Sequence, residues 1–129
     1  MLKSKLLLML ISLIFTTCIY AFDGITFYGA EITDNDRYNS SGERLTSVRD
    51  ILRQDRSNYY LFHIRDRYDQ GDNYFYSKRN REIFDTARIS INPRLANKIV
   101  GNGTVLITVF VLTPDQIDVQ EGLPTPGVD

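Results

Sequence analysis

Hydrophobic and polar positions divide the chain into an apolar leader and a longer part in which both kinds of residue are mixed. Two lysines precede an apolar run from Leu6 to Phe15, and the first acidic residue is Asp23. A basic start, an apolar segment of about 7–15 residues and a small residue before the polar region are typical of a secretory signal peptide. We therefore expect residues 1–21 to be a bacterial signal peptide cleaved after Ala21, and the protein to be periplasmic or secreted.

A membrane anchor is the alternative interpretation of this leader. The apolar stretch is only marginally long enough to cross about 30 Å of hydrocarbon, and the polar residues near its end fit a cleavage region better. Cys18 follows Thr17, whereas a lipid-modified cysteine normally follows a smaller residue. We expect neither a lipid anchor nor a stable membrane span after cleavage.

Residues 22–120 have the mixture of apolar and polar residues that is typical of a single small domain. The tail over 121–129 is rich in Pro and Gly and is expected to be disordered. β-Branched and aromatic residues predict strands over 25–32 and 87–91. The most apolar stretch after the leader, 104–112, predicts a central strand that is covered on both faces. A short edge strand is expected over 117–119.

Two helical segments have clear starting signals. Ser47 or Thr46 is suited to cap a helix over 46–57, in which Ile51 and Leu52 share one face. The pair Asn92-Pro93 predicts the start of a helical turn over 93–100, which Gly101 would end.

The segment from Tyr59 to Tyr68 has two interpretations. The helix could continue through it, because aromatic residues fall in phase with the preceding apolar face. The same residues also have strong strand preference, and a turn over 69–73 followed by Tyr74–Tyr76 would complete a β-hairpin. We favour the hairpin. The pattern as a whole predicts one α+β domain, dominated by antiparallel sheet.

Charge is distributed unevenly along the chain. The formal net charge is only -1, which argues against a nucleic-acid packaging protein. Residues 37–94, however, contain eleven arginines and Lys78 against eight acidic residues. Arg49, Arg53 and Arg56 recur at helical spacing and would form a stripe on one face of the predicted helix.

No residue pattern identifies a reaction. A single Cys and a single His exclude a disulfide framework and metal sites that need several of these ligands. His63 has no evident catalytic partner, and the two acidic turns near Asp34 and Asp69 depart from calcium-loop patterns. We expect no catalytic set, metal or cofactor.

Arginine combined with aromatic residues is the most informative chemistry in the chain. Arginine pairs with carboxylate or phosphate and stacks on aromatic rings. The predicted contact residues are Arg49, Arg53, Arg56, Tyr60, His63, Arg65 and Arg67. They indicate an exported binding protein, of the inhibitor, immunity or envelope-stress kind, with a protein partner or an anionic ligand. The alternatives are a small hydrolase or nuclease that uses His63, a polyanion-binding module, and arginines that are simply paired within the chain.

Overall fold

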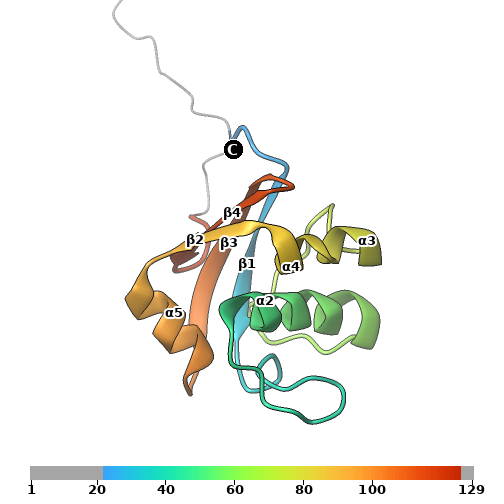
Figure 1. Ribbon diagram of the computed structural model, residues 1–129, viewed down its shortest axis with the longest axis vertical. Coiled ribbons are helices and arrows are strands. Elements are labelled where there is room, and N and C mark those ends of the chain that lie inside the picture. The colour runs from blue at the N-terminus through green and yellow to red at the C-terminus, as the bar shows by residue number, and fades with distance from the viewer. Residues whose placement is uncertain (1–21, 126–129) are drawn as a thin grey trace, which may run out of the picture.

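Four strands form one sheet in the order β1-β3-β4-β2 (Figure 1). The computed structural model describes residues 22–125, so the predicted signal peptide and residues 126–129 of the predicted tail lie outside the described residues. The elements are β1 (Thr26–Ile32), α2 (Val48–Ser57), the π-helix η1 (Asn58–Phe62), α3 (Lys78–Arg81), α4 (Ile83–Thr86), β2 (Arg88–Ile91), α5 (Pro93–Val100), β3 (Val105–Thr113) and β4 (Gln116–Glu121).

The sheet is mixed. Strand β3 is antiparallel to both β1 and β4, whereas β2 lies parallel to β4. The prediction that β3 is an interior strand is therefore confirmed. The prediction of a short edge strand over 117–119 is wrong, because β4 is longer and β2 joins its outer side.

The hydrophobic core lies between one face of the sheet and the helices. Figure 1 shows α5 at the left, α2 at the centre and α3 at the right of this layer. Alternate strand residues face the helices, as a period of two requires. The buried strand residues are Tyr28, Ala30, Ile32, Val105, Ile107, Val109, Val111, Ile117 and Val119. The helices add Ile51 and Leu52 from α2 and Leu95 and Ile99 from α5, and the result is a single α+β domain.

The opposite face of the sheet is covered only in its middle. Gln70 and Pro124 approach Gly29 so closely that a side chain on this residue would meet both. The Thr108 hydroxyl donates to the Gly122 carbonyl at 2.7 Å, so residues just after β4 lie against this face. Nearer one end, Phe27 remains 43% exposed.

Both predicted helix starts are confirmed. The Ser47 hydroxyl accepts from the Asp50 N–H at 3.2 Å, and the Asn92 side chain accepts from the Arg94 N–H at 2.8 Å. Each cap satisfies a backbone donor that has no partner inside the helix. Pro93 occupies the first turn of α5, as the sequence predicts.

The favoured hairpin over 59–76 is wrong. The helix continues beyond Ser57 as the π-helix η1 and ends at His63, whose φ of 55° places it in the left-handed region. The buried Asn58 side chain donates to the Asn35 carbonyl at 2.9 Å and to the Asp36 carboxyl at 3.1 Å. These long-range contacts outweigh the strand preference of the aromatic residues that follow.

The second half of the expected hairpin is a turn instead of a strand. One Asp72 carboxyl oxygen accepts from the N–H groups of Tyr74 and Phe75, at 2.7 and 2.6 Å. This local bonding directs the chain toward the short helices α3 and α4, which the sequence pattern did not indicate.

Replacing Ile107 by Ala should destabilise the protein by about 2–4 kcal/mol, because it removes a fully buried side chain from the middle of the sheet. Leu112→Ala, in the same strand but 37% exposed, should change stability by less than about 0.5 kcal/mol. Urea unfolding measures both changes. Equal, small effects would contradict the interior position of β3.

Candidate functional site

Arg56 points into the core and has no exposed surface. Its Nε donates to Asp55 at 2.8 Å, and its Nη1 donates to Asp72 at 2.9 Å and to the Gln70 carbonyl at 2.8 Å. The guanidinium also stacks on the Tyr28 ring, 3.8 Å from the ring centre. The expected exposed stripe that includes Arg56 therefore does not exist, because this residue is committed to internal partners.

The other two residues of that stripe are also engaged. Arg49 donates to the carbonyl oxygens of Phe84 and Ala87, at 2.6 and 3.3 Å. Arg53 forms an ion pair with Asp85. These contacts join α2 to α4 and to the chain that follows it, so they account for both arginines without a partner molecule.

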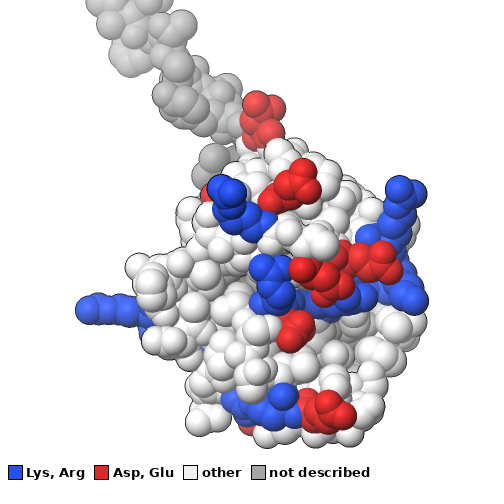
Figure 2. Space-filling view, in the orientation of Figure 1, with Lys and Arg blue, Asp and Glu red and all other residues white. Residues whose placement is uncertain are grey.

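Several further arginines bind backbone carbonyls. Arg37 is buried and donates to the Ile99 carbonyl at 2.9 Å, and Arg44 donates to the Val100 carbonyl at 2.8 Å. Both satisfy acceptors at the end of α5, where helix carbonyls have no partner within the helix. Arg81 binds carbonyl oxygens in the turn before α3. On the face seen in Figure 2, most of the Lys and Arg side chains lie beside Asp or Glu side chains, in a few clusters on a mostly uncharged surface.

A group of carboxyls surrounds the Arg56 network. Burial, with the nearby charge of Asp55, raises the pKa of Asp36 to about 9. The same causes, in the same order, raise the pKa of Asp69 to about 6. Burial also raises the pKa of Asp55, although the neighbouring Arg56 lowers it. Burial and the charge of neighbouring carboxyls thus raise the pKa of Asp36 and Asp69, whereas Asp55 keeps its ion pair with Arg56.

The exposed segment after η1 presents a different kind of surface. We call it the 61–68 surface, and it comprises Leu61, Phe62, His63, Ile64, Arg65, Arg67 and Tyr68. The side chains of Leu61, Phe62 and Ile64 are 57%, 43% and 44% exposed. Single exposed apolar residues are ordinary, but adjacent ones bordered by polar residues mark interaction sites.

The two arginines of the 61–68 surface stack on aromatic rings. Arg65 lies 4.0 Å from the centre of the Tyr59 ring, and Arg67 lies 5.2 Å from that of Tyr68. Within residues 22–125, neither arginine forms an ion pair with a carboxylate. The intervening Asp66 accepts from the Thr33 hydroxyl and from the Asn35 amide, both just after β1. The two guanidinium charges therefore remain available to a partner.

A groove of about 370 Å³ adjoins this surface. Phe62 and Ile64 line it, together with Tyr38 from the loop after β1. Amide side chains, including Gln54 and the buried Asn58, supply much of its polar lining, and Asp34 adds one carboxylate. An apolar surface with a few fixed amide groups is suited to a short protein segment.

His63 and Tyr60 have different roles. The His63 side chain is exposed and makes no hydrogen bond with the described residues, so no acid is placed to assist it as a base. The Tyr60 hydroxyl donates to the Asp72 carbonyl and accepts from the Asp72 N–H, at 2.8 and 2.7 Å. Tyr60 therefore fixes a turn.

Three of the predicted contact residues, namely His63, Arg65 and Arg67, are exposed within one short segment. Sequence reasoning missed the apolar residues beside them, Leu61, Phe62 and Ile64, together with Tyr38 across the groove. In the favoured hairpin, strand alternation would place Phe62 and Ile64 on one face. The exposure of these residues follows from the helical path through η1, which the favoured hairpin did not include.

Within residues 22–125, no group of three or more His, Cys, Asp or Glu side chains is arranged to hold a metal ion. The same residues contain no helix that is both long enough and apolar enough to cross a membrane. Comparisons with protein-family models, curated proteins and solved structures give no match. The 61–68 surface and its groove are thus identified by their own geometry.

Arg56→Met should destabilise the protein by about 3–5 kcal/mol, because it leaves the buried carboxyls of Asp55 and Asp72 without their cation. Arg53→Met is the matched control. Its ion pair is partly exposed, so the loss should be about 0–1 kcal/mol. Equal losses in urea unfolding would contradict the central position of Arg56.

Acidification from about pH 8 to about pH 5 should stabilise the protein. The pKa of Asp36 rises from its ordinary 3.8 to about 9 on folding, so the folded state holds a proton that the unfolded state releases. The resulting stability is complete below about pH 3.8 and is lost as the pH rises toward about 9. Asp69 adds an effect of the same sign up to about pH 6. The urea midpoint should therefore increase on acidification, with a smaller slope in Asp36→Asn; a decreasing midpoint would contradict the raised pKa values.

Proposed function

We propose that the protein is a small exported binding protein that recognises a partner protein through the 61–68 surface and the adjoining groove. The observation that carries this proposal is the juxtaposition of adjacent exposed apolar residues with two arginines that have no carboxylate partner within residues 22–125. The basic and apolar leader supports export.

The chemistry of the surface specifies the kind of partner. Leu61 and Phe62 would contact apolar side chains, since their burial gives the favourable free energy of association. Arg65 and Arg67 would pair with carboxylates beside those apolar residues, and their stacking on Tyr59 and Tyr68 limits the side-chain entropy lost on binding. The partner segment is therefore acidic and apolar.

The alternatives receive less support from the described residues. A hydrolase that uses His63 lacks an acid or nucleophile hydrogen-bonded to the imidazole. A polyanion-binding module needs a broad set of free cations, but Arg49, Arg53 and Arg56 bind groups of the protein itself.

Affinity capture with matched variants tests the proposed function. The full chain, carrying a C-terminal tag, is produced in its native cell, recovered from periplasmic and secreted fractions, and cross-linked to bound proteins. The exported form should have the mass of residues 22–129 plus the tag. Arg65→Glu/Arg67→Glu and Leu61→Ser should each lose the captured protein, or raise its dissociation constant by more than about tenfold.

Two control variants make the same kinds of change, in charge and in apolar surface, outside the 61–68 surface. Lys78→Glu/Arg79→Glu makes the same change in charge on α3, and Tyr76→Ser removes a side chain that is 67% exposed. Both should retain the captured protein. Equal capture by all variants, or recovery of uncleaved chain only, would overturn the proposal. Binding that depends on both basic pairs, is unchanged by Leu61→Ser and falls steeply with salt would assign the surface to a polyanion instead.

A further inference from the structure

The free edge of β1 is covered along only part of its length. In antiparallel pairing, successive residues direct their backbone groups alternately toward the neighbouring strand and away from it. Gly29 directs its groups away from β3: its N–H donates to the Gln70 side chain at 2.8 Å, and its carbonyl accepts from the Gln70 N–H at 2.9 Å. The Glu31 N–H donates to Asp69 at 2.9 Å. Asp69 and Gln70 thus form an edge strap over Gly29 and Glu31.

The edge strap ends before it reaches Phe27. This residue lies two positions before Gly29, so its backbone groups also point away from β3. Within residues 22–125, the Phe27 N–H and carbonyl have no hydrogen-bond partner. The chain leaves the edge at Gly71 because Arg56 binds the Gln70 carbonyl and the Asp72 carboxyl.

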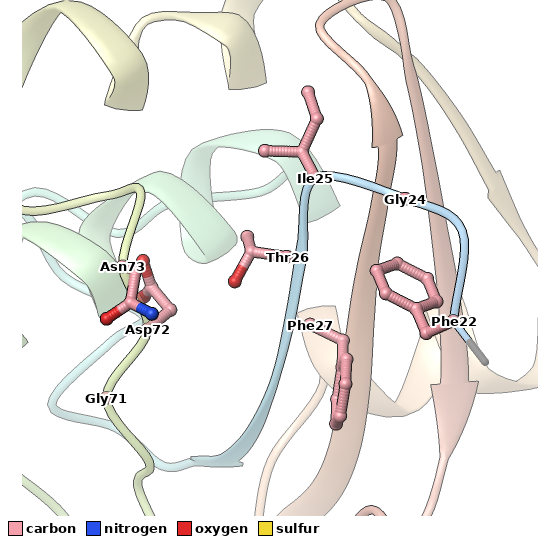
Figure 3. A pocket seen from close by; sticks show the side chains of 8 residues that line it. All are labelled: Phe22, Gly24, Ile25, Thr26, Phe27, Gly71, Asp72 and Asn73. Atoms are coloured by element: carbon pink, nitrogen blue, oxygen red, sulfur yellow. The ribbon is translucent and has the colours of Figure 1, made fainter. Parts of the chain in front are cut away.

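A notch of about 570 Å³ opens where the strap leaves the edge. Phe22 and the residues from Gly24 to Phe27 line one side, and those from Gly71 to Asn73 line the other. Figure 3 shows the Thr26 side chain pointing across the notch toward Asp72 and Asn73, whereas Phe27 lies on the other side of the strand.

We propose that this notch binds an extended peptide segment of another protein by adding it as a short strand to the free edge of β1. The segment would exchange backbone hydrogen bonds with Phe27 and continue the antiparallel path of the edge strap. Ile25 and Phe27, which are 42% and 43% exposed, would contact its side chains. This site is separate from the 61–68 surface and does not depend on the proposed function.

The lining favours an uncharged segment. The Asp72 carboxyl is the only ionisable side chain among the lining residues, and it is fully buried against Arg56. Its second oxygen accepts from the N–H groups of Tyr74 and Phe75. The side chains that line the notch therefore offer no free charge to a ligand, and the one charge at its border in the proposed exported form is the α-amino group of Phe22.

A second copy of the chain fits this edge less well than a linear peptide does. Pairing two β1 strands along their length would require the edge strap to leave Gly29 and Glu31, with the loss of its three hydrogen bonds. A peptide end needs only the part of the edge that is already open. The geometry thus favours a segment that ends, or turns, beside Gly71.

Amide hydrogen exchange followed by NMR tests the site. In the free protein, the Phe27 amide should exchange faster than the strapped amides of Gly29 and Glu31. The probe is an acetylated and amidated pentapeptide of alternating threonine and valine. At saturation it should slow exchange at Phe27 by about tenfold or more, which corresponds to about 1.4 kcal/mol of added protection. The same peptide, N-methylated at alternate residues, should have no effect.

Matched variants at the notch complete the test. Asn73→Trp should fill the notch and abolish the protection at Phe27, whereas Asn73→Ala should retain it, and both should keep the unfolding midpoint of the parent. Equal protection by the N-methylated peptide, or none by either peptide, would overturn the proposal. Protection of Phe27 that rises with protein concentration in the absence of peptide would assign the edge to a second copy, and would also overturn it.

Discussion

The buried guanidinium of Arg56 is the contact on which the arrangement of the middle of the chain depends. It stacks on Tyr28 in β1, pairs with Asp55 in α2, and binds Gln70 and Asp72 in the following loop. A buried cation is costly unless its charge and most of its donors are satisfied, so these segments meet at one point, and of the Arg56 guanidinium nitrogens only Nη2 has no hydrogen-bond partner among the described residues. That requirement sets where the loop leaves the edge of β1. The position of this loop in turn opens the notch and places the segment that carries the 61–68 surface.

Arginine serves mainly as an internal connector in this protein. A guanidinium has five donors in a planar array and remains charged when it is buried, so it can satisfy carbonyl groups that a short helix or a turn leaves without partners. The arginines that bind backbone carbonyls in this way include Arg37, Arg44, Arg49, Arg56 and Arg81. Much of the positive charge of residues 37–94 is therefore structural. Within residues 22–125, the exposed basic residues of this segment without an ion pair include Arg65 and Arg67 after η1, and also Lys78, Arg79, Arg88 and Arg94.

Local patterns were sufficient for the elements whose signals are local. Strand preference located β1 and β3, and capping residues located the starts of α2 and α5. The path through Tyr59–Phe62 depends on contacts made by Asn58 with residues more than twenty positions earlier, which no local pattern contains. The orientation of Arg56 has the same origin: helical spacing places it beside Arg49 and Arg53, but only the fold decides that it is buried. For the same reason, the sequence indicated the basic half of the 61–68 surface and missed its apolar half.

The order of the strands has a consequence for when the chain can fold. Strand β1 lies near the start of the described residues, yet its only partner in the sheet is β3, with Ile32 opposite Val105. The β3–β4 pair joins neighbouring segments, whereas β1 pairs with β3 across most of the chain, and closing so long a loop is slow. A partial chain that ends before β3 has no sheet to cover its helices and stays open. A growing chain therefore stays open until β3 has been synthesised, and a chain that ends before β3 should not fold.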